Sequence, residues 1–285
     1  MILNETYCLS NGVKIPRLGL GTWFIPNGQA AEAVRYAVAV GYRLIDTAQA
    51  YENEAGVGGG VRSCGVPREQ IFVTSKVAAE AKDYWSAARS IDETLARMGL
   101  SYLDLMIIHS PQPWADFRGG DYAQGNREAW RALEDAYKAG KLRAIGVSNF
   151  LKPDLENILS TCRIKPMVNQ ILLHISNTDL ELMSWCQEQG ILVEAYSPIA
   201  HGEALKNARI VEMAEKYGVS PAALCIRYVL ELGTVALPKT ADPVHMRDNA
   251  AVDFSILPED MNLLKHIAPI GSYGKFSVFP VFSGK

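Results

Sequence analysis

Four polar residues whose types suit proton transfer follow three apolar runs of the sequence. Asp46 and Tyr51 follow the run YRLI, Lys76 ends the run IFVTSK, and His109 directly follows LDLMII. A tyrosine can protonate a carbonyl oxygen, but an ordinary pKa near ~10 makes it a poor acid at neutral pH. A nearby ammonium favours the phenolate and lowers that pKa. Tyr51 with Lys76 therefore suits the reduction of a carbonyl group.

The other two residues have roles in the same chemistry. A charge next to apolar strand residues needs a partner, and Asp46 is the natural partner for Lys76. His109 would hydrogen-bond the substrate carbonyl, and Tyr51 with His109 would stabilise the developing oxyanion. Each residue taken alone also has a structural interpretation: a loop cap, a turn aromatic, a surface lysine or a core histidine. Their joint occurrence favours a catalytic set.

Further polar residues end the later apolar runs. They are Ser148, Asn149, Gln170, Tyr196, Ser197, Lys239 and Thr240. The carboxyl ends of the strands converge on one face of a closed parallel barrel, and barrel enzymes place their active sites there. We expect one functional site at that face.

The elements that must position these residues alternate regularly along the chain. Eight short apolar runs, at 17–22, 42–48, 71–77, 103–109, 143–149, 166–171, 192–198 and 234–240, predict strands. Helical patterns occupy 29–40, 83–98, 126–139, 151–160, 178–189, 207–217 and 220–232. Most of the runs are apolar on both faces, which is typical of parallel strands covered by helices. Strands that alternate with helices predict a (β/α)8 TIM barrel, as a single domain over residues 1–285.

Three local features bear on this fold. Tyr7–Lys14, with Asn11-Gly12 as its turn, predicts a β-hairpin that caps the barrel bottom. The glycine-rich stretch Gly56–Gly60 has no following Lys-Ser/Thr, so we interpret it as a loosened helix start and not as a phosphate loop. The first strand does not lead into GxGxxG, which argues against an open dinucleotide-binding sheet.

Composition excludes several classes of protein. The 285 residues carry a net charge of -3 without a Lys/Arg run, so neither nucleic acid nor a membrane surface is an expected partner. The N-terminus lacks the pattern of a signal peptide. The five cysteines are scattered without a CxxC pair, which argues against disulfides and a cysteine zinc site. We expect a cytoplasmic enzyme, monomeric because no exposed apolar helix or coiled-coil pattern appears.

Six segments resemble the aldo-keto reductase family, in the right order along the chain. They are GVKIPRLGLGTW, GYRLIDTAQAYENE, GVPREQIFVTSK, GLSYLDLMIIHSP, GKLRAIGVSNF and VEAYSPI, and the resemblance runs from about Val13 to about Phe254. The similarity is greatest to the short prokaryotic branch, which includes 2,5-diketo-D-gluconate reductase-like members. The resemblance implies a barrel that binds NADPH without a Rossmann domain. It also implies reversible reduction of an aldehyde, a ketone, or a keto-acid or keto-sugar, with Asp46, Tyr51, Lys76 and His109 as the catalytic tetrad.

The resemblance also assigns cofactor contacts. Ser148, Asn149 and Gln170 would hold the nicotinamide carboxamide, and Tyr196 would stack on its ring. The remaining positions cover the pyrophosphate path, the adenosine 2′-phosphate and the adenine end, namely Gly21, Thr22, Trp23, Ser197, Ile199, Lys239, Thr240, His245, Asp248 and Asn249. His245 replaces an arginine that is usual for the 2′-phosphate, so we expect NADPH to be preferred and NADH to be usable.

The sequence departs from the family around the substrate. Ala78 and Ser110 occupy places where the family often has tryptophan. Trp23, Phe24 and Trp114 remain to wall the substrate pocket, with a lid of aromatics packing on itself as the alternative. Two missing indoles predict a pocket that accepts wider or more polar substrates, and the alternative is that Trp114 or Phe276 fills the space.

Two alternatives to a reductase remain open at this stage. One is a metal-dependent barrel hydrolase that would use Asp46, His109, His174 and His201. No HxH pair follows a strand, so no metal is expected. The other is a non-catalytic subunit that senses the cofactor on the same barrel, against which the complete tetrad argues.

Overall fold

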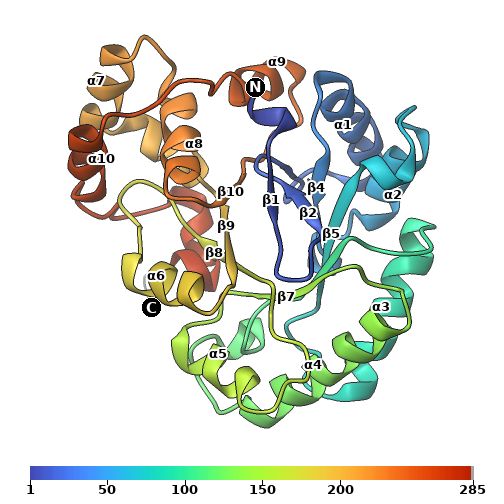
Figure 1. Cartoon of the computed structure of the whole chain (residues 1–285). Helices are drawn as coiled ribbons and strands as arrows, with labels where there is room; N and C mark the ends of the chain where they lie inside the picture. The colour runs from blue at the N-terminus through green and yellow to red at the C-terminus, as the bar shows by residue number, and fades with distance from the viewer. Residues whose placement is uncertain (284–285) are drawn as a thin grey trace.

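Eight parallel strands form a nearly closed barrel with helices around it (Figure 1), in a computed structural model that describes residues 1–283. The last two residues of the predicted domain 1–285 lie outside the described residues. The sheet order is β10-β9-β8-β7-β6-β5-β4-β3. The strands are β3 (Leu20–Gly21), β4 (Leu44–Asp46), β5 (Phe72–Val77), β6 (Leu105–Ile108), β7 (Ile145–Ser148), β8 (Val168–Leu172), β9 (Leu192–Tyr196) and β10 (Val235–Leu237). All eight predicted runs contain one of these strands, and the predicted barrel is confirmed.

The two edge strands of this sheet approach each other. Isolated parallel bridges join Leu18 to Ala236 and Gly21 to Lys239. The backbone N–H of Gly21 donates to the carbonyl of Pro238 at 3.0 Å. These contacts join the segment around β3 to the segment around β10. The polar residues that follow the strands can therefore face one common space.

Ten α-helices surround the strands. They are α1 (Asn27–Val40), α2 (Glu54–Ser63), α3 (Tyr84–Met98), α4 (Ala123–Lys138), α5 (Lys152–Leu159), α6 (Leu180–Glu188), α7 (Ala208–Lys216), α8 (Pro221–Glu231), α9 (Pro243–Ala250) and α10 (Pro258–Lys265). Ser220 caps α8 through its side chain, as the Ser-Pro pair predicts. The sequence analysis does not predict α9 or α10, which have eight residues each.

The glycine stretch Gly56–Gly60 lies inside α2 and does not form a loosened helix start. A Cβ atom on Gly58 would collide with the Met98 backbone at the end of α3. A Cβ on Gly60 would come within 2.6 Å of the Val34 side chain on α1. The glycines therefore allow α2 to pack closely against both neighbouring helices, which outweighs their low helix propensity.

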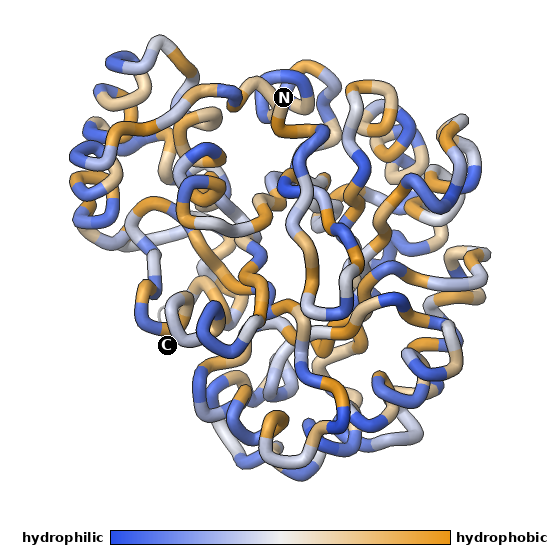
Figure 2. The backbone as a smooth tube through the Cα atoms, in the orientation of Figure 1, coloured by the Kyte–Doolittle hydropathy of each residue, from blue (hydrophilic) through white to orange (hydrophobic). Residues whose placement is uncertain are grey.

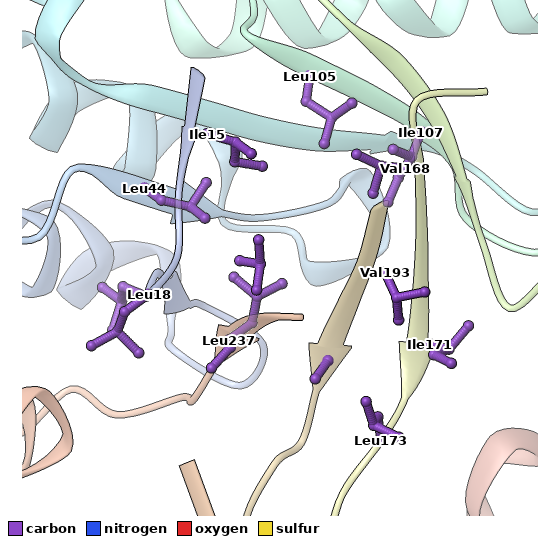
Figure 3. Close-up of a cluster of buried hydrophobic side chains, with 14 of the residues drawn as sticks. Ile15, Leu18, Leu44, Leu105, Ile107, Val168, Ile171, Leu173, Val193 and Leu237 are labelled. Carbon is purple, nitrogen blue, oxygen red and sulfur yellow. The ribbon is translucent and has the colours of Figure 1, made fainter. Parts of the chain in front are cut away.

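The predicted N-terminal hairpin is present, with strands β1 (Thr6–Cys8) and β2 (Lys14–Pro16) paired antiparallel. Ile15 of β2 is fully buried, and Figure 3 shows it in a hydrophobic cluster with Leu18, Leu44 and Leu237. Leu44 is the first residue of β4, so the hairpin covers the barrel end at which the strands begin. The opposite end remains available for a site.

Hydrophobic residues concentrate on the barrel strands, whereas hydrophilic residues are frequent on the surrounding helices (Figure 2). All six residues of β5 are buried, in accordance with a parallel strand covered on both faces. Within residues 1–283, no helix is both long enough and apolar enough to cross a bilayer.

Candidate active site

A buried ion pair lies at the centre of the candidate site. Lys76 Nζ is 2.6 Å from Asp46 Oδ1 and also donates a hydrogen bond to the carbonyl of Thr47 at 2.9 Å. Lys76 is 0% exposed and Asp46 is 4% exposed. Adjacent strands β4 and β5 carry the two residues, with Asp46 paired to Thr74 in the register. The partner that the sequence predicts for Lys76 is therefore the one it has.

Tyr51 lies above this pair, at the end of the 3₁₀ helix Gln49–Tyr51 that follows β4. Lys76 Nζ is 4.9 Å from the centroid of the Tyr51 ring. Burial, with a smaller effect of the Asp46 charge, raises the pKa of Tyr51 well above 10. The expected lowering of this pKa by Lys76 is thus outweighed by burial. The phenol keeps its proton throughout the neutral pH range.

His109 approaches Tyr51 from the end of β6. Their ring centroids are 5.7 Å apart, and His109 is 7% exposed. Burial, and then the charges of Lys76 and Lys82, hold the pKa of His109 well below 6.5. The imidazole is therefore neutral near pH 7 and can donate one N–H hydrogen bond.

Lys82 holds the backbone that follows His109. Its ammonium donates to the carbonyl of Ser110 at 2.7 Å and to Asn126 Oδ1 at 2.9 Å. Burial lowers the pKa of Lys82 to about 8. No sequence pattern singles this lysine out, because it lies in a loop before α3.

Residues of β7, β8 and β9 form a second hydrogen-bonded group. The Ser148 hydroxyl donates to the carbonyl of Gln170 at 2.8 Å, and Asn149 Nδ2 donates to Ser148 Oγ at 3.0 Å. The Tyr196 hydroxyl donates to Asn149 Oδ1 at 2.7 Å. These four residues, Gln170 through its backbone carbonyl, are the ones that the resemblance assigns to the nicotinamide, and the structure brings them together.

Gln170 joins this group to the ion pair. Its Nε2 atom donates to Asp46 Oδ2 at 2.8 Å and to Glu194 Oε2 at 2.9 Å. Glu194 lies in β9, is 0% exposed, and is absent from the predicted site. The available signal is a single acidic residue within the apolar run LVEAYS. Burial, and then the Asp46 charge, raise the pKa of Glu194 to about 7.

A cavity of about 560 Å³ opens above these residues. Fifteen predicted site residues line it: Gly21, Thr22, Trp23, Phe24, Asp46, Tyr51, His109, Trp114, Ser148, Asn149, Gln170, Tyr196, Ser197, Ile199 and Lys239. Phe276, Phe279 and Phe282 of the C-terminal segment also line it. The sequence analysis names Phe276 as an alternative filler of the pocket and misses Phe279 and Phe282. The segment carries no periodic pattern, and only its density of aromatics could have marked it.

Other predicted residues lie away from the cavity wall. Ala78 donates its backbone N–H to Gln49 Oε1, and Ser110 Oγ accepts from the N–H of Gln112. Neither side chain lines the cavity. Thr240 Oγ1 accepts from the N–H of Asp242 just before α9. Helix α9 carries His245, Asp248 and Asn249, of which only Asn249 is buried.

The residues of the hydrolase alternative do not form a cluster. His174 Nε2 lies 2.9 Å from the Tyr273 hydroxyl, whereas the His201 ring stacks on Phe276 with centroids 4.0 Å apart. In the part of the chain that the structure describes, no three His, Cys, Asp or Glu side chains are arranged to hold a metal ion.

Comparisons with known proteins agree with this geometry. A sequence model described as the aldo/keto reductase family matches residues 17–269. Glyoxal reductase from Bacillus subtilis is 43% identical over 262 residues, which cover 91% of each chain. A solved aldo/keto reductase from Brucella melitensis is 34% identical with a TM-score of 0.86, and covers 93% of this chain and 98% of its own. A Bombyx mori aldo-keto reductase solved in complex with NADP is 30% identical with a TM-score of 0.83, and covers 92% of each chain.

Proposed function

The chain belongs to the aldo/keto reductase family and is an oxidoreductase that reduces carbonyl groups, and we propose that Tyr51 is its general acid. One observation carries this assignment. Tyr51 is a protonated phenol that borders the cavity, with the buried ammonium of Lys76 4.9 Å from its ring. An ammonium in this place stabilises the phenolate that remains after proton transfer.

Several residues fit a nicotinamide cofactor. The Tyr196 ring lines the cavity and offers an aromatic face, and Gln170 borders the same space with its amide. Lys239 also lines it, and burial together with the nearby Lys275 ammonium lowers the pKa of Lys239. The ammonium groups of Lys239 and Lys275 repel each other. An anionic phosphate bound near both would offset that repulsion.

The reduction then divides between the cofactor and the chain. A bound nicotinamide supplies the hydride to the carbonyl carbon. The neutral His109 imidazole donates an N–H hydrogen bond to the carbonyl oxygen and orients it. Tyr51 donates its proton to that oxygen, while Asp46 keeps Lys76 charged and in place.

Replacing Tyr51 with phenylalanine tests this role. Tyr51→Phe removes the proton and leaves the ring, so kcat for aldehyde reduction should fall by roughly two to four orders of magnitude. Quenching of protein fluorescence by NADPH should be unchanged, because Tyr51 is not among the proposed cofactor contacts. A variant that keeps most of the wild-type kcat would exclude Tyr51 as the acid.

We infer that the carbonyl substrate is small and apolar or aromatic. Trp23, Phe24 and Trp114 line the cavity together with the phenylalanines of the C-terminal segment. Phe279 lies 5.0 Å from Trp23 and 5.7 Å from Phe24, measured between ring centroids. Apolar walls of this kind favour apolar ligands, so the expectation of a more polar pocket is replaced.

A serine at position 279 tests the aromatic wall. Phe279→Ser should lower kcat/KM for benzaldehyde by roughly tenfold, since the lost apolar contact is worth ~1–2 kcal/mol. The smaller substrate glyoxal should respond less. Val278 is 79% exposed in the same segment, so Val278→Ser serves as the matched control and should change neither value. Equal effects of both substitutions would remove Phe279 from the substrate site.

We propose that NADPH is the preferred cofactor and that NADH is also used. Lys239 borders the cavity, and His245 is exposed on α9 in the place of the family's arginine. A guanidinium is always charged and offers a planar fork to a phosphate, whereas an imidazole does neither reliably at neutral pH. We therefore propose that His245 binds the 2′-phosphate of NADPH more weakly than an arginine at the same position would.

The substitution His245→Arg should tighten NADPH without affecting NADH, which lacks the 2′-phosphate. One added charge-assisted hydrogen bond is worth about 1.5–3 kcal/mol, or roughly ten- to a hundred-fold in the dissociation constant. Titration of both cofactors by fluorescence measures this directly. Equal tightening of NADH and NADPH, or no tightening of either, would place His245 away from the 2′-phosphate.

We also propose that the protein is a cytoplasmic monomer built as one domain. Its five cysteines are free thiols, which suits a reducing compartment. Sedimentation of the purified enzyme at the mass of two or more chains would contradict the monomer.

A further inference from the structure

Glu194 is an acidic residue buried in the interior of the barrel. It lies in the middle of β9, it is 0% exposed, and its Oε2 atom accepts a hydrogen bond from Gln170. No hydrogen-bond partner exists for its Oε1 atom among residues 1–283. Burial of a carboxyl group with an unpaired oxygen lowers the stability of the fold. A functional role would explain why a native protein retains such a group.

Glu194 and Asp46 together fix the orientation of the Gln170 amide. A side-chain amide has two N–H donors, and those of Gln170 lie 2.8 Å from Asp46 Oδ2 and 2.9 Å from Glu194 Oε2. A rotation of the amide by half a turn would place its oxygen against two carboxyl groups. The Gln170 oxygen is thereby left for the cavity, where it can accept a hydrogen bond from the N–H of a carboxamide ligand.

The same contacts connect Glu194 to the proton donor. Asp46 receives Gln170 on Oδ2 and Lys76 on Oδ1, and Lys76 reaches to 4.9 Å from the Tyr51 ring. A continuous series of polar contacts therefore runs from Glu194 through Gln170, Asp46 and Lys76 to Tyr51.

We propose that Glu194 is a positioning residue for carbonyl reduction, which orients Gln170 toward the nicotinamide carboxamide and modulates the charge of the Asp46–Lys76 pair beneath Tyr51. This inference rests on the proposed function of Tyr51. Glu194 does not contact the substrate and acts through the other residues of the series.

The charged groups that face Glu194 are Asp46 from β4 and Lys76 from β5, and Gln170 from β8 is uncharged. The pKa of Glu194 is raised to about 7 by burial and by Asp46. Below pH 7, Lys76 therefore faces one negative charge, and above pH 7 it faces two. The second charge weakens the attraction of Lys76 for the Tyr51 phenolate, so reduction slows as pH rises.

Neighbouring groups do not produce the same transition. The pKa of Tyr51 lies well above 10 and that of His109 well below 6.5. Lys82 has a pKa near 8, but it titrates in the wild type and in a Glu194 variant alike. The ratio of kcat/KM between the wild type and the Glu194 variant therefore reports only the titration of Glu194.

Glu194→Gln tests the charge alone. A glutamine can keep an oxygen toward Gln170 and place its amide nitrogen where Oε1 has no partner. The wild-type kcat/KM for benzaldehyde should fall relative to this variant by roughly three- to fivefold between pH 6 and pH 8, because the added negative charge disfavours the Tyr51 phenolate. The ratio should titrate near pH 7. A ratio that is constant with pH would overturn the charge effect.

Glu194→Met tests the hydrogen bond, because methionine has a similar length and no acceptor of comparable strength. Freed from one partner, Gln170 should bind NADPH less well, with a dissociation constant raised roughly two- to tenfold. The dissociation constant for Glu194→Gln should change less. Wild-type NADPH affinity in both variants would overturn the orienting role.

Thermal unfolding separates positioning from a structural role. A carboxyl with a folded pKa above its unfolded value destabilises the fold as pH rises between the two values. The Tm of Glu194→Gln at pH 8 should thus equal or exceed that of the wild type, and a lower Tm would indicate a structural residue. If the wild type is active and Tyr51→Phe is not, failure of these Glu194 outcomes overturns only the inference about Glu194.

Discussion

A buried ammonium sets the pattern of polar contacts in this barrel. Removing a charge from water costs several kcal/mol even after the protein relaxes, so Lys76 requires a counter-charge with good geometry. Asp46 meets that need at 2.6 Å, but its second carboxylate oxygen then requires a donor of its own. Gln170 supplies that donor, and its remaining N–H requires a further acceptor, which is Glu194. Each buried polar group in this series therefore requires the next one as its hydrogen-bond partner.

These contacts also explain why the site depends on a barrel. Asp46 belongs to β4 and Gln170 to β8, which are four places apart in the strand order. In an open sheet, strands so far apart cannot touch. In the barrel their side chains meet across the interior, 2.8 Å apart. The bridges from Leu18 and Gly21 to the last strand therefore help to hold the catalytic geometry, although neither residue takes part in the chemistry.

The strands and the residues at their ends could be predicted from the sequence because both depend on local patterns. An apolar run marks a buried parallel strand, and the polar residue that ends it must lie at the barrel mouth, as Lys76 and His109 do. The role of Glu194 could not be predicted in this way, because its hydrogen-bond partner Gln170 lies 24 positions away along the chain. The phenylalanines of the C-terminal segment likewise gain their place only from the rings they meet, such as Trp23. Helix α9 fails for another reason, since only Met246 and Asn249 of its residues are buried and no regular apolar face marks it.

The position of Ala78 shows a further limit of a family resemblance. Correspondence along the chain places a residue near the site, but it does not say whether a side chain as small as a methyl group reaches the cavity. At Ala78 the N–H bonds to Gln49, and the phenylalanines of the C-terminal segment line the cavity in its place.

Burial has opposite effects on Tyr51, the proposed acid, and on the charges that would assist it. It raises the pKa of Tyr51 well above 10, which makes the phenol a weaker proton donor. The same exclusion of water lowers the effective dielectric constant, so Lys76 acts on the phenolate more strongly than it would in solution. It also keeps His109 neutral, so the imidazole carries no extra proton and Tyr51 remains the proposed acid. A phenol with a raised pKa can therefore still act as the acid. Its proton transfer leaves a Tyr51 phenolate that faces the buried Lys76 ammonium.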